Sequence, residues 1–316
     1  MKKIWVILIA IVAVLLLAGV AGLIAAERRF AFLTSPKVSH SAYLVPETRV
    51  QIAFEPELGA DAIIQLIEQA VPENRRPSEW VLRQVFPQKA VVLLAPEPLA
   101  GGIHITAFVN DQRVGPIIRD AVNNADLTHT FPMIKWASEG MTLEQRGVLT
   151  LRGEMPIDPH TLELARTTWP EARVDTVLAL EGGHVIEAVL DNRDGGAFTV
   201  LSAFEALQGP DGENDPDFFV GMFANIASLR LTADFAGPND VVLSIRVECP
   251  PDVEEDVPAS LQFLLDMTLA QTQEPIRDAG AALTGTSRVE NKTIIGEYTL
   301  SGLDKLIAAE EDIAAS

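Results

Sequence analysis

Residues 229–235 read LRLTADF and residues 241–247 read VVLSIRV, with AGPND between them. Apolar and polar side chains alternate along both runs, which is the pattern of β-strands that bury one face. A short connection containing glycine and proline is typical of a β-hairpin. The stretch therefore predicts two antiparallel strands joined by a tight loop.

The same alternation occurs on the N-terminal side of this hairpin and again after it. It predicts two more hairpins, each with a pair of glycines in its loop. It also predicts three single strands. The hairpins join 91–95 to 103–109 and 174–180 to 184–190, and the single strands cover 49–54, 147–152 and 293–300.

Between the strands, apolar residues recur at helical spacing. Ser78, Asp158 and Asp252 are suited to N-cap three of the helices, because their side chains can accept hydrogen bonds from free backbone N–H groups. Hairpins make antiparallel sheets, so the fold class is α+β, with antiparallel sheets and helices packed on one face. The predicted helices cover 59–71, 78–86, 114–122, 161–169, 197–207, 218–226, 257–271 and 303–313.

The two halves of the chain share an order of predicted elements. Each contains a helix, a hairpin, a helix, a strand and a final helix. This favours an internal duplication, with one lobe over 49–170 and a second over 171–316. The alternative stays open, because a shared order arises easily in any α+β fold.

The N-terminus carries a long apolar run. Residues 4–26 contain no charge and number 23, which is enough for one helix to cross a bilayer core of roughly 30 Å. We expect an uncleaved signal anchor, because the hydrophobicity continues past Ala21; a signal peptide cleaved before Gly22 is the alternative. Residues 1–3 then form a cytoplasmic tail and 27–48 a linker, and the rest lies outside the cytoplasm, in the periplasm or at the cell exterior.

The charge balance limits the partners. The chain has a formal net charge of −20, which excludes nucleic acid and disfavours anionic lipid headgroups. Its contact with the membrane is therefore expected only through residues 4–26, and its other partner is expected to be a protein. The one cysteine, Cys249, falls on the apolar face of its strand, so we expect a buried thiol and no intramolecular disulfide.

One acidic loop is a candidate metal site. Asp211, Glu213, Asp215 and Asp217 lie within seven residues and offer the oxygen ligands that calcium prefers. The loop departs from the EF-hand pattern, because its glycine comes second and its twelfth position is Met222. A solvated turn is the alternative interpretation.

No other pattern points to chemistry. His104 and His184 lie in different hairpins, without metal-ligand spacing, and are expected to make ordinary strand hydrogen bonds. The pairs at 101–102, 182–183 and 195–196 are expected to be turn glycines with positive φ. We therefore expect no cofactor and assign no catalytic residue. The chain is interpreted as a non-enzymatic binding or scaffold protein, and the alternative is an extracytoplasmic hydrolase with carboxylates in a cleft between the lobes.

Overall fold

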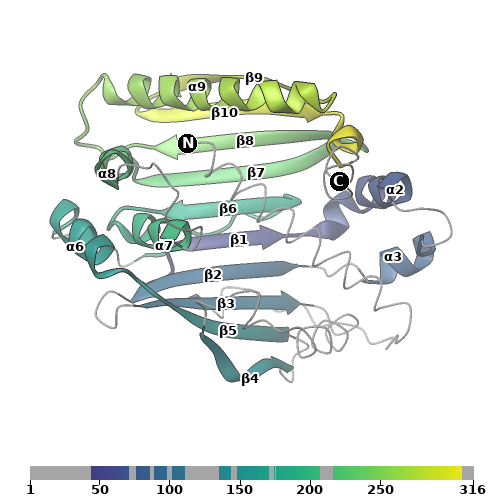
Figure 1. Cartoon of the computed structure of the whole chain (residues 1–316), viewed down its shortest axis with the longest axis horizontal. Coiled ribbons are helices and arrows are strands. Elements are labelled where there is room, and N and C mark those ends of the chain that lie inside the picture. Colours follow the sequence, from purple (N-terminus) through teal and green to yellow (C-terminus); the bar gives the residue numbers. More distant parts are fainter. Residues whose placement is uncertain are drawn as a thin grey trace.

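The computed structural model describes residues 44–70, 76–85, 89–97, 102–110, 135–143, 148–170, 174, 176–206 and 216–307. These residues form one 10-stranded sheet in the order β4-β5-β3-β2-β1-β6-β7-β8-β10-β9, antiparallel throughout (Figure 1). The predicted α+β class with antiparallel pairing is confirmed, but the strands form one large sheet rather than several sheets. The strands are β1 (Val50–Phe54), β2 (Ala90–Glu97), β3 (Gly102–Asn110), β4 (Lys135–Leu143), β5 (Val148–Pro156), β6 (Ile186–Asp191), β7 (Ser228–Gly237), β8 (Asp240–Glu248), β9 (Ala282–Glu290) and β10 (Thr293–Ser301).

Helices follow most of the predicted ranges. The prediction that Asp158 caps a helix is confirmed, since its Oδ2 accepts from His160 N at 2.9 Å and Thr161 N at 3.1 Å. The predicted helix over 114–122 lies outside the described residues. The helices are η2 (Pro56–Gly59), α2 (Ala60–Ala70), α3 (Glu79–Val85), α6 (Pro159–Thr168), α7 (Gly196–Ala206), α8 (Pro216–Ala224) and α9 (Val257–Asp278), with a short turn of helix over 303–307.

The sheet contains the same strand arrangement twice. From the centre outward, the first half runs β1, β2, β3, β5, β4, and the second runs β6, β7, β8, β10, β9. The two halves meet where β1 pairs with β6, with Val50 opposite Leu190. Each central strand is followed by a helix pair, α2–α3 or α7–α8 (Figure 1). This recurrence supports the hypothesis of a duplication, and the lobe boundary between residues 170 and 171 stays a prediction.

One face of the sheet carries α7 and α9. Alternation along β1 points Val50 and Ile52 to this face. Val50 packs in a cluster with Val200 of α7, and the second half packs Leu269 of α9 against Ile294. Ile52 contacts both clusters, so the core on this face is continuous across the β1–β6 centre.

The structure differs from several sequence predictions. Residues 176–180 are not a strand, so the predicted hairpin of 174–180 with 184–190 does not form. Two edge strands, β4 and β9, were not predicted at all. Asp252 does not cap the helix after Pro251, because α9 begins at Val257 with Asp256 in the N-cap position.

The predicted membrane anchor over 4–26 lies outside the described residues. Among the residues that are described, no helix is both long and apolar enough to cross a bilayer.

Candidate functional site

An extended strap crosses the face of the sheet opposite α7 and α9. The strap comprises residue 174 and residues 176–183, and among the described strands none pairs with it. Leu178 and Leu180 pack on a cluster that includes Ala53 of β1. The backbone of the strap is bound by side chains that come from the sheet and from the loop after β6.

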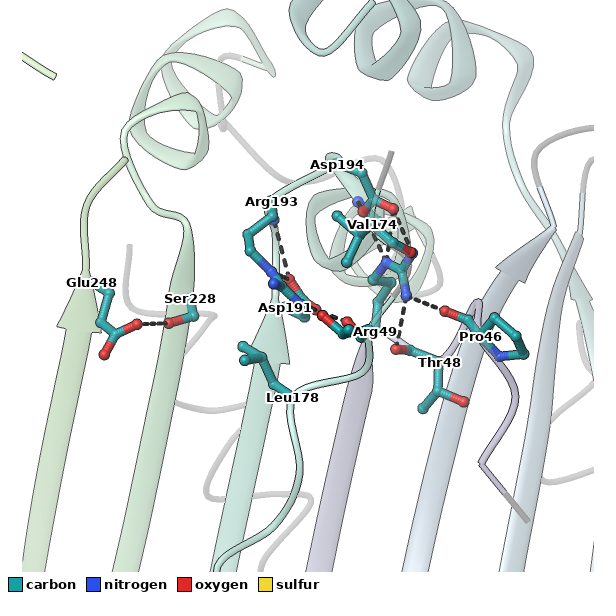
Figure 2. Close-up of polar contacts among 12 residues, drawn as sticks. Pro46, Thr48, Arg49, Val174, Leu178, Asp191, Arg193, Asp194, Ser228 and Glu248 are labelled. Atoms are coloured by element: carbon teal, nitrogen blue, oxygen red, sulfur yellow. Dashed lines mark hydrogen bonds and ion pairs between the residues drawn. The ribbon is translucent and has the colours of Figure 1, made fainter. Parts of the chain in front are cut away.

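Arg49 connects the strap to that loop. It directly precedes β1, and its Nε and Nη2 donate to the Asp194 carboxylate at 2.9, 2.8 and 2.6 Å (Figure 2). Nη1 donates to the carbonyls of Pro46 at 2.6 Å and Thr48 at 3.1 Å, and Nη2 also donates to Val174 O at 3.4 Å. The side chain is only 6% exposed. The guanidinium is therefore hydrogen-bonded within the protein, and it connects the strap to the loop after β6.

A second arginine, Arg193, makes a similar arrangement; it directly precedes Asp194 in the loop after β6. Arg193 donates from Nε and Nη2 to Asp191 at 2.8 and 2.6 Å (Figure 2). Its Nη2 also donates to Thr176 O of the strap at 2.7 Å. The hydrogen bonds to Asp191 are the main cause that raises the pKa of Arg193. Val174 and Thr176 thus present alternate carbonyls to two arginines, as an extended backbone allows.

A buried ion pair lies beneath the strap. The Glu187 carboxylate on β6 accepts from Glu181 N and Gly182 N, both at 2.8 Å, and pairs with Arg230 of β7. Arg230 also donates to Ala179 O at 2.9 Å. Glu187 is 1% exposed, so its charge is stabilised only by these partners.

Gln51 completes the network on β1. Its Nε2 donates to Leu178 O of the strap, while its buried Oε1 has no partner among the described residues. The strap therefore replaces the backbone ladder of a strand with hydrogen bonds to sheet side chains. This explains why an alternating sequence over 174–180 is extended without joining the sheet.

Asn192 fixes the loop between β6 and α7. Its Nδ2 donates to Phe223 O at 2.8 Å and Ile226 O at 3.1 Å, and its Oδ1 accepts from Phe198 N at 2.8 Å in the first turn of α7. One amide side chain thus connects the start of α7 to the end of α8.

A cavity of about 220 Å³ lies beside this loop. Trp169 and Leu162 form part of its apolar wall, and Glu47, Arg49 and Asp194 are among its polar lining groups. The cavity is lined from both halves of the chain. Asp194 is bonded to Arg49 and also accepts from Gly196 N at 3.1 Å, so its carboxylate holds the loop in place.

The turn-glycine prediction holds at three positions. Gly182, Gly183 and Gly195 have φ of 74°, 82° and 77°, a region that glycine adopts without steric cost. The prediction is wrong for Gly196, which does not have positive φ; a Cβ there would lie 2.4 Å from Cγ of Arg49. Because Gly196 has no side chain, Arg49 can pack closely against the start of α7. Gly102 lies in β3, also without positive φ, and residue 101 is outside the described ranges.

His104 of β3 and His184, which precedes β6, do not meet in one site. His104 Nε2 lies 2.6 Å from Glu97 Oε2 on the exposed surface. His184 Nδ1 lies 2.6 Å from Asp234 Oδ2, near the start of β6. Neither lines the 220 Å³ cavity. Each lies beside a carboxylate, as expected of ordinary hydrogen bonds, but the expected strand position is wrong for His184.

The proposed calcium loop falls mostly outside the described residues. Asp211, Glu213 and Asp215 are not described, and Asp217 lies in the first turn of α8. Across the part of the chain that is described, no group of three or more His, Cys, Asp or Glu side chains is placed to hold a metal ion. The calcium site stays a prediction.

Cys249 lies in the core, as its strand pattern predicted. It packs in the cluster that contains Ile245 and Val247. Burial is the main cause that raises the pKa of this thiol, and Lys292 opposes the shift.

Slow thiol chemistry is therefore expected at Cys249. Because the thiolate is the reactive form, burial and a raised pKa both reduce its rate. At pH 8, a disulfide reagent should modify the folded protein at least about tenfold more slowly than the urea-unfolded protein. Equal rates in the two states would show that the thiol is accessible. The measurement is the release of the chromogenic thiol over time.

The network beneath the strap was not found from the sequence. Arg49, Glu187 and Arg230 are single charged residues, each next to or inside an apolar strand. The available signal is that Glu187 interrupts the otherwise apolar run 185–190. It shows a polar position in a strand but does not show what lies above it.

Comparisons with known proteins give little. No protein family matches the chain, and no curated protein matches it. A crystal structure of TP0453, crystal form I, has a TM-score of 0.35 and 10% identity, covering 87% of this chain and 97% of that chain. A likeness of this strength carries no argument about what the chain does.

Proposed function

We propose that the chain is a membrane-anchored binding or scaffold protein, without catalytic activity, that holds a protein partner outside the cytoplasm. The apolar run over 4–26 supports the anchor. The net charge of −20 supports a protein partner rather than nucleic acid.

One observation carries the proposal. Arg49, Arg193 and Arg230 all donate hydrogen bonds to carbonyl groups of the strap. Each of these arginines is also paired with a carboxylate of the sheet or of one of its loops. These charged side chains therefore hold the strap against one face of the sheet. A surface fixed in this way suits a protein that binds a partner protein. Catalytic acids and bases, in contrast, must be available to a substrate.

The second candidate is an extracytoplasmic hydrolase. It is favoured by one feature, since Glu47 and Asp194 line the same cavity and come from different halves of the chain. Two carboxylates beside one cavity can serve as the general acid and the general base of a hydrolysis.

The test is crosslinking of the full-length protein in its native membrane, with wild type beside Glu47→Gln. A scaffold predicts one discrete adduct with another protein, formed equally by both forms, because glutamine keeps the shape of Glu47. Glu57→Gln, at the other end of β1, is the matched control. A hydrolytic activity of the purified protein that Glu47→Gln abolishes and Glu57→Gln retains would contradict the scaffold and support the hydrolase.

A further inference from the structure

We propose that the outer edge of β9 binds an extended strand of a partner protein, whose sequence alternates basic and apolar residues. The proposal rests on the binding function above and names the surface and the partner's chemistry. Such strand addition extends a sheet through main-chain hydrogen bonds, while alternate side chains provide specificity.

The position of β9 makes this possible. The described sheet ends at β9, which pairs with β10 on one side over all nine of its residues. Asn291 and Lys292, at φ 48° and 63°, form the two-residue turn between these strands. The residues that flank such a turn bond to each other, and the pattern then alternates. The backbone groups of Leu283, Gly285, Ser287 and Val289 therefore point away from β10.

The edge carries only part of the usual protection against pairing. Natural edge strands are shortened, interrupted by a bulge or proline, lined with charged side chains, or covered by a helix or loop. Here Arg288 and Glu290 are charged, and α9 contacts the edge through Ser287. β9 has nine residues, its register to β10 is unbroken, and it contains neither proline nor lysine. Gln262 of α9 donates to Ser287 O at 3.0 Å and engages one outward carbonyl. The other outward positions extend on both sides of that contact.

An apolar side chain at this edge favours an alternating partner. Val289 of β9 is 37% exposed. Val289 alternates with Arg288, so it points to the face on which α9 packs against β9 (Figure 1). A bound strand that alternates would place apolar residues beside Val289 on that face and polar residues on the other.

The charge near β9 determines which polar residues are expected in the partner strand. On the face away from α9, the end of the sheet carries Glu290 and Glu297 around Arg288, which bonds Glu290 at 2.7 Å. With a net charge of −20 over the chain, basic residues are favoured on this side of the partner strand and acidic ones are repelled.

The probe is a nine-residue peptide of alternating lysine and valine, titrated against the full-length protein in neutral detergent. A peptide of alternating glutamate and valine is the comparison. The first should bind at least about tenfold more tightly than the second. On binding it should slow amide hydrogen exchange at 283, 285, 287 and 289, which are the outward positions of β9.

Two valines provide matched variants. Val289→Lys places a positive charge on the edge, whereas Val242→Lys places the same charge on β8, where Val242 is 40% exposed inside the sheet. Val289→Lys should weaken lysine–valine binding about tenfold and Val242→Lys should leave it unchanged. Non-specific attraction to an acidic protein would treat the two variants alike.

Several results would overturn the proposal. They are equal binding by both variants, equal binding of both peptides, no binding, or protection elsewhere than in β9. A dimer that Val289→Lys dissociates would assign the edge to a second copy instead. None of these outcomes removes the crosslinked partner that the proposed function predicts, so the two proposals fail separately.

Discussion

Replacing Arg230 by methionine is expected to lower the free energy of unfolding by about 3–5 kcal/mol. Methionine retains much of the packing of the arginine stem, so the main loss is the guanidinium. Glu187 is then left 1% exposed with a charge that only two backbone N–H groups bind. The measurement is urea unfolding followed by tryptophan fluorescence.

The matched control is Arg246→Met. Arg246 lies directly opposite Arg230 in the neighbouring strand, but its side chain is 55% exposed and its partner Glu248 is 44% exposed. Exposed ion pairs contribute about 1 kcal/mol or less. If both substitutions cost the same, Glu187 is not held as a buried charge and the description of the strap network is wrong.

Replacing Gly195 by alanine is expected to cost about 2–5 kcal/mol, from steric overlap and from strain in the left-handed region together. The φ of Gly195 is 77°, and a Cβ would lie 2.5 Å from Cε3 of Trp169. Trp169 packs on Phe198 with ring centroids 5.6 Å apart, so it cannot move without disturbing the cluster that Phe198 forms with Phe223 of α8. Thermal and urea unfolding would both report the loss.

Gly183→Ala separates the two causes. Gly183 has φ of 82° but nothing within 4 Å of a built Cβ. It should cost only the left-handed penalty of about 1–2 kcal/mol. A Gly195→Ala loss no larger than that of Gly183→Ala would show that Trp169 relaxes freely, contrary to the packing described here.

The inner strands of the fold could be predicted because each buries one face. LRLTADF and VVLSIRV carry an apolar residue at nearly every second position, and they form β7 and β8 with Leu231 opposite Ile245. The edge strand β9 could not be found in this way. Its sequence ALTGTSRVE is mostly polar, because an edge strand has fewer neighbours and β9 is exposed at most of its positions. β4, at the other edge, was not predicted either.

The strap shows a different limit of sequence patterns. Alternation over 174–180 correctly indicates an extended backbone, since Leu178 and Leu180 both pack on the sheet. It does not indicate what bonds that backbone. Here the carbonyl groups of the strap accept hydrogen bonds from Arg49, Gln51 and Arg230. These three residues are far from the strap in sequence, and they come together only because β1, β6 and β7 are neighbours in the sheet.

The central claim, a tethered scaffold that offers β9 to a partner, is tested most directly by crosslinking from a single position. A photoactivatable residue would replace Val289 in the full-length protein in its native membrane, with Val242 replaced in a parallel sample. The account predicts one discrete adduct from position 289, containing a second protein with an alternating basic and apolar segment, and none from position 242. Equal adducts from both positions, or none from 289, would contradict it.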